Sequence, residues 1–161
     1  MSKIVVGDKI KPNAKEMIRK LKSMNIETWL ITGDNEIVGN SVAKELEIDQ
    51  VISNCLPLDK ATHIEKIQNI GQRVAMIGDG INDAPALAKA DLSLAMGTGT
   101  DVAISASDVT IVKGDIEKVV SFLELSMGSM KIIKQNLFLS MIYNSLLIPI
   151  AAGVLVFFDG P

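Results

Sequence analysis

The sequence is poor in cysteine and histidine. Its 161 residues include one cysteine, Cys55, and one histidine, His63. A lone cysteine cannot close a disulfide within the chain, and it matches none of the paired-cysteine spacings of zinc sites. We therefore expect Cys55 to be a buried, inert thiol. His63 is expected at the surface or in support of another side chain, rather than on a metal ion.

The chain also lacks an excess of positive charge. It has 16 Lys and Arg against 19 Asp and Glu, which gives a formal net charge of −3. A surface that binds nucleic acid needs clustered cationic side chains, so we expect no nucleic-acid partner.

Charged side chains are missing from one long stretch, residues 137–158. An apolar run of this length is enough for a helix to cross the hydrocarbon core of a bilayer, so membrane lipid is an expected partner. Four lysines precede the stretch and one aspartate follows it: Lys113, Lys118, Lys131, Lys134 and Asp159. By the positive-inside rule, this asymmetry predicts a single span with the preceding soluble domain in the cytoplasm.

From Lys3 to about Lys118, short β-rich runs alternate with helical patterns, which is typical of a parallel sheet flanked by helices. The expected strands are 3–6, 27–31, 51–53, 73–77, 91–95 and 109–112, and the expected helices are 13–24, 35–46, 60–70 and 84–89. Residues 115–134 have helical apolar spacing and are expected to run as a stalk into the span. Polar motifs fall where strands end, and ligands of open parallel sheets bind at these carboxyl ends.

The strongest of these motifs is residues 78–83, with the sequence GDGIND, directly after the apolar run 74–77. Asp79 and Asp83 lie four residues apart on a turn that glycine permits, and their carboxylates are hard oxygen ligands suited to Mg²⁺ beside a phosphoryl group. The alternative is that the two aspartates only cap the turn and the following helix.

Two further motifs are weaker when taken singly. Thr32, Gly33 and Asp34 follow a strand and offer a hydroxyl and free backbone amides to a phosphate, or Asp34 and Asn35 simply cap the next helix. Lys60, at the start of a helix, is suited to a phosphate or a carboxylate, or is a solvated surface lysine. Together, the three motifs supply the positioning and charge neutralisation that phosphoryl transfer needs.

These motifs resemble the second, third and fourth motifs of the haloacid dehalogenase superfamily. The strings GDGINDAPALAKAD at 78–91 and GTGTDVA at 97–103, with DKIKP at 8–12, resemble the heavy-metal, copper-type P-type ATPases over almost the whole chain. The resemblance implies an α/β, haloacid dehalogenase-like (Rossmann-like) parallel sheet with flanking helices. Residues 1–118 would be the C-terminal part of the phosphorylation domain, 119–135 a stalk helix, 136–158 a transmembrane helix and 159–161 a loop.

The same resemblance implies roles for individual side chains, with Mg²⁺ as cofactor and ATP as the substrate of the complete enzyme. Catalytic roles are implied for Thr32, Lys60 and Asp83. Contacts to phosphate or nucleotide are implied for Thr32, Gly33, Asp34 and Asn82. Binding of Mg²⁺ is implied for Asp79 and Asp83.

In the apolar stretch, Tyr143 and Asn144, followed by Pro149, resemble the helix that forms part of the Cu⁺ path in copper-transporting members. Neither side chain is a soft ligand, whereas Cu⁺ prefers thiolate or thioether, so other helices would have to supply the soft ligands. The resemblance places the chain in a membrane, most simply the plasma or inner membrane of a prokaryote.

The sequence departs from that family in one decisive way. It contains no Asp-Lys-Thr-Gly-Thr string, in which the family's phosphorylated aspartate lies, and no Cys-Pro-Cys helix. Our leading hypothesis is a fragment of an ATP-driven Cu⁺-exporting ATPase with an aspartyl-phosphate cycle, inactive alone and dependent on the remaining segments. The alternative is a membrane-anchored, non-catalytic module that modulates an intact pump. An independent phosphatase would need an Asp-x-Asp pair, which is absent.

Overall fold

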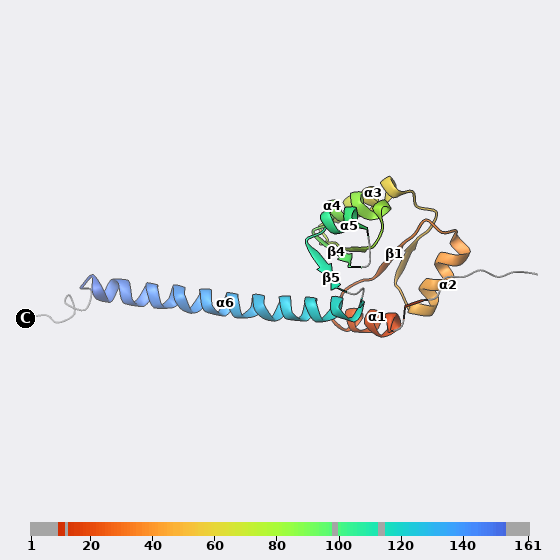
Figure 1. The fold of residues 1–161 in the computed structure, drawn as a ribbon. Helices are drawn as coiled ribbons and strands as arrows, with labels where there is room; N and C mark the ends of the chain where they lie inside the picture. Colours follow the sequence, from red (N-terminus) through yellow and green to blue (C-terminus); the bar gives the residue numbers. More distant parts are fainter. Residues whose placement is uncertain (1–9, 12, 98–99, 113–114, 154–161) are drawn as a thin grey trace, which may run out of the picture. The chain divides into compact units, whose positions relative to one another are not determined.

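Strands and helices alternate along the first part of the chain, as the sequence predicts (Figure 1). The computed structural model describes residues 10–11, 13–97, 100–112 and 115–153. The chain divides into two compact units, Met1–Val120 and Ser121–Pro161. The predicted strand at 3–6 lies outside the described residues.

The described strands are all parallel to their neighbours and form two sheets. In one sheet, β1 (Trp29–Ile31) pairs with β2 (Gln50–Ile52). In the other, β4 (Leu92–Met96) lies between β3 (Ala75–Gly78) and β5 (Val109–Ile111). The prediction of parallel strands is confirmed. The prediction of one sheet is not met among the described residues, because β1 and β3 each have a single neighbour there.

The helices of the first unit are α1 (Ala14–Ser23), α2 (Glu36–Leu46), α3 (Pro57–Asn69), α4 (Ala84–Lys89) and α5 (Asp101–Ser105), with a 3₁₀ turn, η1 (Ile81–Asp83). The four predicted helices are confirmed to within a few residues. Asn35 caps α2, because its side chain accepts a hydrogen bond from the Val38 amide at 3.1 Å. The capping alternative for Asn35 is thus confirmed.

The core of the first unit is built around β4. Most of this strand is buried, and the largest fully buried side chains come from α3, α4, β4 and the first turn of α6: Ile64, Leu87, Leu94 and Val119. The buried strand, with α4 packed against it and α3 packed against α4, gives the site a rigid base.

Three aspartates fasten the amino ends of the strands with the same kind of hydrogen bond. Asp49 Oδ2 accepts from the amide and hydroxyl of Thr28, at 2.9 and 2.8 Å. Asp108 Oδ2 accepts from the amide and hydroxyl of Ser93, also at 2.9 and 2.8 Å. Asp91 Oδ2 accepts from the Val74 amide at 3.0 Å. Each of these aspartates lies just before one strand and accepts hydrogen bonds at the start of its neighbouring strand in the sheet.

The second unit consists of the continuation of α6 (Glu117–Ala151), whose first turn belongs to the first unit. The predicted stalk and membrane helix both fall on this one helix as far as Ala151, and residues 154–158 of the predicted span lie outside the described residues. Within the described part of the chain, none of the helices combines the length and the apolar character needed to cross a membrane.

Candidate functional site

The turn that follows β3 folds one carboxylate back over the end of the strand. Asp83 Oδ2 lies 3.4 Å from the amide nitrogens of both Asp79 and Gly80 and accepts from them. A Cβ at Gly78 would lie 2.7 Å from the Asp83 Cβ, closer than real Cβ contacts allow. Glycine at position 78 is therefore what lets the carboxylate sit against the strand end.

The other oxygen of Asp83 binds Lys60, which extends from the first part of α3. The Lys60 Nζ lies 2.7 Å from Asp83 Oδ1, and each of the two side chains is only 14% exposed. Among the ion pairs of the described residues, no other has both partners so well covered. Lys60 holds a carboxylate, so the alternative of a solvated surface lysine is wrong.

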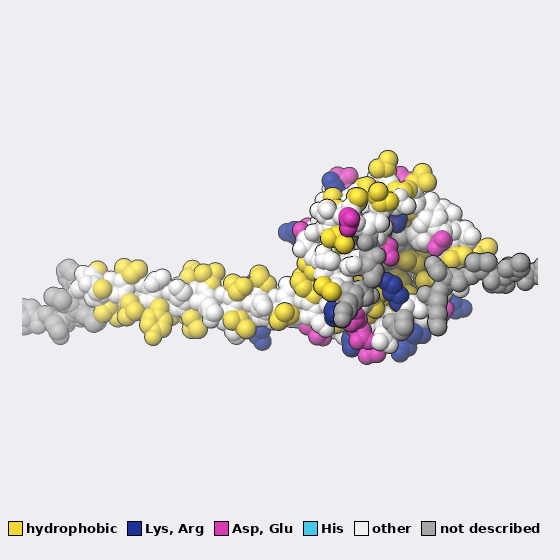
Figure 2. Space-filling model, in the orientation of Figure 1, with side chains coloured by type: hydrophobic (Ala, Val, Ile, Leu, Met, Phe, Trp, Pro, Cys, Tyr) yellow, Lys and Arg dark blue, Asp and Glu magenta, His cyan; other side chains and the backbone are white. Residues whose placement is uncertain are grey.

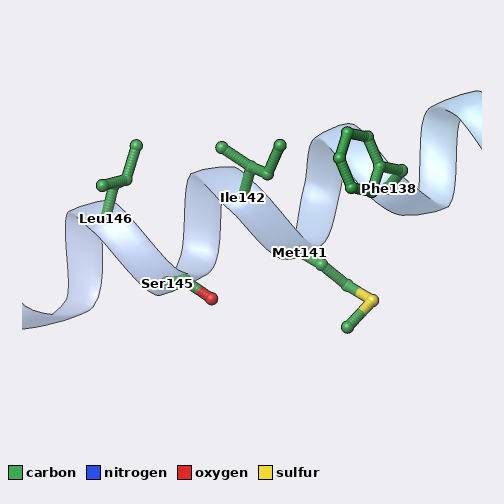
Figure 3. A pocket seen from close by; sticks show the side chains of 5 residues that line it. All are labelled: Phe138, Met141, Ile142, Ser145 and Leu146. Carbon is green, nitrogen blue, oxygen red and sulfur yellow. The ribbon is translucent and has the colours of Figure 1, made fainter.

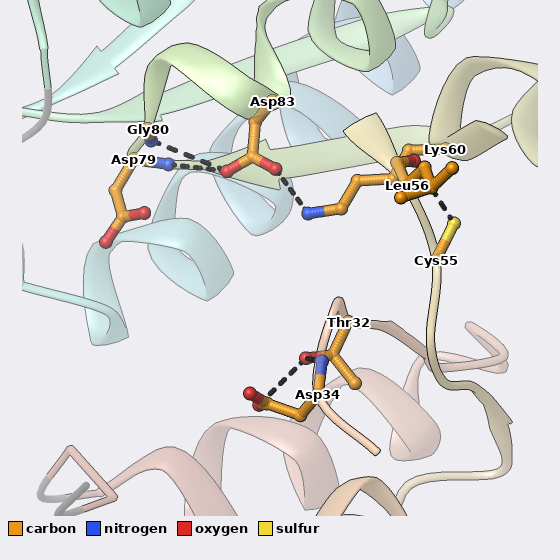
Figure 4. Close-up of polar contacts among 8 residues, drawn as sticks. All are labelled: Thr32, Asp34, Cys55, Leu56, Lys60, Asp79, Gly80 and Asp83. Carbon is orange, nitrogen blue, oxygen red and sulfur yellow. Dashed lines mark hydrogen bonds and ion pairs between the residues drawn. The ribbon is translucent and has the colours of Figure 1, made fainter. Parts of the chain in front are cut away.

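Asp79 is the open carboxylate of the site. Its side chain points away from Asp83 (Figure 4), and within the described residues it has no hydrogen-bond or ion-pair partner. Its backbone carbonyl accepts from the amide of Thr100, at 3.0 Å, which fixes the turn against the start of α5. Thr100 also caps α5 through its side chain, a role that its place before Asp101 could have indicated.

The donor set fits Mg²⁺ in a limited way. Both oxygens of Asp83 already accept hydrogen bonds, which leaves Asp79 as the carboxylate free to bind a cation. No group of three or more His, Cys, Asp or Glu side chains able to hold a metal ion occurs in the described segments. Mg²⁺ commonly uses one or two carboxylates and completes its shell with water and phosphate oxygens, which suits Asp79.

At the end of β1, the Thr32 hydroxyl is fixed by Asp34. Thr32 Oγ1 donates to Asp34 Oδ2 at 2.9 Å and accepts from the Asp34 amide at 3.1 Å. The Thr32 hydroxyl therefore donates its hydrogen bond to a carboxylate in this state. This hydrogen bond must break before the hydroxyl can donate to a phosphate oxygen. A Cβ at Gly33 would make an ordinary 3.5 Å contact with the Cys55 carbonyl, so glycine is not required there by crowding.

The loop after β2 links the two halves of the site. The Cys55 amide donates to the Thr32 carbonyl at 3.0 Å, and the next residue, Leu56, is the N-cap of α3. The Lys60 amide donates to the Leu56 carbonyl at 3.2 Å, and its side chain reaches Asp83. The ends of β1, β2 and β3 are therefore held around the first turn of α3 (Figure 4). Sequence reasoning missed this link, because a backbone contact of Cys55 leaves no motif.

Cys55 itself is buried and donates weakly to the Leu56 carbonyl. Burial raises the pKa of its thiol, the nearby Asp59 raises it further, and Lys60 lowers it. The expected burial of Cys55 is confirmed, and a thiol with a raised pKa is a poor nucleophile, in keeping with the expected inert cysteine.

Among the described residues, the side chain of Asn82 makes no hydrogen bond or ion pair with Lys60, Asp79 or Asp83. Asn82 is exposed in η1, and Tyr143 and Asn144 lie on the exposed part of α6, in the second unit. Their functional roles stay predictions. The structure gives two groups of side chains after the strand ends: Lys60 with Asp83 beside the open Asp79, and, separately, Thr32 with Asp34 (Figure 4). An ammonium, a hydroxyl and an open carboxylate are the kinds of group that suit a phosphoryl group with a divalent cation.

Comparison with known proteins agrees with this arrangement. The haloacid dehalogenase-like hydrolase family profile matches residues 1–91. The chain is 52% identical over 152 residues to the copper-exporting P-type ATPase of Vibrio cholerae, which covers 94% of this chain and 17% of that protein. It is 55% identical over 149 residues to the copper-exporting P-type ATPase of Staphylococcus haemolyticus, covering 92% of this chain and 19% of that protein.

A solved structure extends the likeness beyond the family profile. The crystal structure of a zinc-transporting PIB-type ATPase in the E2·Pi state matches 91% of this chain and 24% of that one, with a TM-score of 0.84 and 31% identity. The chain spans about a fifth of the length of the curated relatives described above.

Proposed function

The chain belongs to the haloacid dehalogenase-like hydrolase family, and from this we propose that it is the C-terminal part of the phosphorylation domain of a copper-translocating P-type ATPase. The complete pump would export Cu⁺ at the expense of ATP through an aspartyl-phosphate. Because the chain has no Asp-Lys-Thr-Gly-Thr string, the phosphorylated aspartate would come from a remaining segment. The observation that carries the proposal is the covered Lys60–Asp83 ion pair beside the open carboxylate of Asp79.

Within such a site, each residue has a distinct task. Lys60, oriented by Asp83, offsets the negative charge of the phosphorylated aspartate. The Thr32 hydroxyl, once released from Asp34, donates to a phosphoryl oxygen, with the amides around Gly33 and the side chain of Asn82 as further donors. Asp79 would hold Mg²⁺. Asp83 is the other proposed ligand, and it would have to release the turn amides to bind the ion, since both of its oxygens accept hydrogen bonds in this structure. The bound ion would neutralise charge on the phosphoryl oxygens.

The unpaired edges of β1 and β3 support the supply of a strand from elsewhere. Both strands are apolar, as strands with two neighbours usually are, yet each has one partner among the described residues. An extended segment that pairs with both would bring its own carboxyl end to Thr32 and Asp79. This is where a phosphorylated aspartate is needed.

The proposal extends to the membrane part of the pump. Residues 136–158 would form a single span with the first unit on the cytoplasmic side, and Tyr143 and Asn144 would line part of the Cu⁺ path. Support comes from the exposed apolar side chains of α6, such as Leu137, Phe138 and Leu146. Soft ligands for Cu⁺ would come from other segments.

A chimera tests this function. The homologous segment of the Vibrio cholerae copper-exporting ATPase is replaced by this chain, and phosphoenzyme formation from ATP is measured with Mg²⁺ and Cu⁺. We expect an acid-stable, hydroxylamine-sensitive phosphoenzyme that Asp79→Asn lowers about 100-fold. Glu45→Gln, which changes an exposed carboxylate of α2, is the matched control and should leave the level unchanged.

The result that would count against the proposal is a folded, membrane-inserted chimera that is not phosphorylated. The isolated chain, given ATP and Mg²⁺, should form no phosphoenzyme. A second candidate is the non-catalytic module, which the combination of an assembled site and a missing nucleophile also favours. It predicts that the added chain changes the ATPase rate of an intact pump, whereas a fragment would leave that rate unaltered.

A further inference from the structure

A continuous track of exposed side chains runs along α6 within the second unit. One shallow, open stretch of this surface comprises Ser126, Met127, Met130, Lys131, Lys134, Gln135 and Phe138. A second comprises Phe138, Met141, Ile142, Ser145 and Leu146 (Figure 3). Phe138 belongs to both stretches, so the first leads directly into the second.

The two ends of this track differ in chemistry. Its residues come singly or as neighbouring pairs, and these recur every three or four positions, which places them along one side of the helix. Lys131 and Lys134 are the only charged residues between Leu125 and Gly153. Beyond Phe138 the track is apolar apart from the Ser145 hydroxyl, and hydrophobic side chains are gathered along this part of the helix (Figure 2). The track is therefore cationic at its amino end and apolar at its carboxyl end.

We propose that this track binds an anionic phospholipid, with its phosphate at Lys131 and Lys134 and one acyl chain along Phe138 to Leu146. The charge is complementary, and the flexible lysine stems can cover apolar surface while their ammonium groups stay at the headgroup level. The eight residue steps from Phe138 to Leu146 amount to a rise of about 12 Å along a helix. That length fits within one leaflet, about half of a hydrocarbon core of about 30 Å.

The spacing of the track would also suit a seam between two helices. A second copy is disfavoured by charge. A parallel copy in register would set Lys131 and Lys134 against the same lysines, and no acidic residue between Leu125 and Gly153 could pair with them. An antiparallel copy would set the lysines against apolar side chains. A lipid phosphate satisfies both ammonium groups and continues into an apolar tail. The proposal rests on the membrane association put forward above, but on no part of the phosphorylation chemistry.

The test compares partition of the full chain into phosphatidylcholine vesicles with and without about one third phosphatidylglycerol, at 0.1 M salt. We expect the anionic vesicles to bind more tightly, and each lysine to account for about five-fold of that preference, since a lysine near an anionic surface contributes about 1 kcal/mol. Lys131→Gln with Lys134→Gln should remove most of it. Lys44→Gln with Lys66→Gln, which changes the net charge equally on exposed positions of the first unit, should change it less than two-fold.

Substitution of Phe138 by serine should weaken binding to both kinds of vesicle, because it removes apolar contact rather than charge. Three results would each overturn the proposal: no binding of the wild-type chain to either vesicle, an equal effect of the two double-lysine variants, or a detergent-solubilised dimer without added lipid that Phe138→Ser converts to a monomer. The last would identify the track as a chain–chain interface. None of these results bears on phosphorylation of the chimera, so the two proposals fail separately.

Discussion

At the scale of single residues, Asp79 and Asp83 lie in the same sequence motif but have different environments. Both carboxylate oxygens of Asp83 accept hydrogen bonds, from Lys60 and from the turn amides, whereas only the backbone amide and carbonyl of Asp79 are engaged. A largely covered carboxylate without its ammonium partner is costly, because its charge has lost water without gaining an opposite charge. Lys60 and Asp83 should therefore behave as one unit in folding.

We predict that Lys60→Ala lowers the free energy of unfolding of the chain by on the order of 3 kcal/mol, as expected when a covered ion pair loses one member. Urea denaturation followed by circular dichroism measures the change. The apolar double variant Lys60→Met with Asp83→Leu should cost less than the sum of its single changes. The control is Lys89→Ala, which breaks the exposed pair with Glu65 and should cost less than about 1 kcal/mol. Equal losses at positions 60 and 89 would contradict the prediction.

The sequence suggested Thr32, Lys60, Asp79 and Asp83 as site residues because their side chains suit phosphate or Mg²⁺ and because they follow strands or, for Lys60, lie at the start of a helix. It did not indicate that Lys60 selects Asp83, because the two lie 23 residues apart and meet only through the packing of α3 against η1. The hydrogen bond between Thr32 and Asp34 was likewise not foreseen, since the same residues are equally suited to capping.

At the scale of elements, three aspartates accept hydrogen bonds at the strand starts, and we call Asp49, Asp91 and Asp108 the carboxylate clasps. They make the stability of the fold sensitive to acid. Hydrogen bonds from Lys22 and from the amide and hydroxyl of Thr28 lower the pKa of Asp49 to about 2. Those from the Val74 amide, Gln68 and Arg73 lower the pKa of Asp91 to about 2, and the Ser93 amide and hydroxyl lower the pKa of Asp108. In each case the folded state binds its proton more weakly than the unfolded chain does.

The sign of the pH dependence follows from this difference. An aspartate of the unfolded chain titrates near its ordinary pKa of about 3.9, so the clasps stabilise the fold fully above that pH. Their contribution is lost as the pH falls from about 4 towards 2. We predict that the melting temperature drops across this window, and that Asp49→Asn and Asp91→Asn lower it at pH 7 and flatten the drop. Glu45→Gln is the control, and a drop as steep in the aspartate variants as in the wild-type chain would contradict the prediction.

The sequence predicted those helices and strands correctly whose signals lie within a short stretch of the chain. Alternating apolar runs and helical spacing located β1 to β5 and α1 to α4. α5 was missed because five residues are too few to establish a helical period. The division into two sheets was also missed, because strand pairing depends on contacts between distant residues and not on the composition of β1 or β3.

At the scale of the whole molecule, β1 and β3 each have an edge without a partner among the described residues, and this leads to a prediction about assembly. A strand inserted between β1 and β3 would gain hydrogen bonds on both sides, so a polypeptide that carries such a strand should bind this chain without a covalent link. The Vibrio cholerae ATPase truncated before the region that this chain matches is a suitable partner, since this chain would supply the matching region. We expect the two, when co-expressed, to purify as a one-to-one complex and to form the hydroxylamine-sensitive phosphoenzyme.

Two variants of the truncated partner separate assembly from chemistry. Replacing its phosphorylated aspartate by asparagine should leave the complex intact and abolish the phosphoenzyme. Proline placed within the strand before that aspartate should prevent complex formation, because proline removes an amide that the sheet needs and is not tolerated in a central strand. On the side of this chain, Asp79→Asn should preserve the complex and lose the phosphoenzyme. Complex formation that is indifferent to the proline would show that the pieces associate elsewhere, and the idea of a shared central strand would then have to be abandoned.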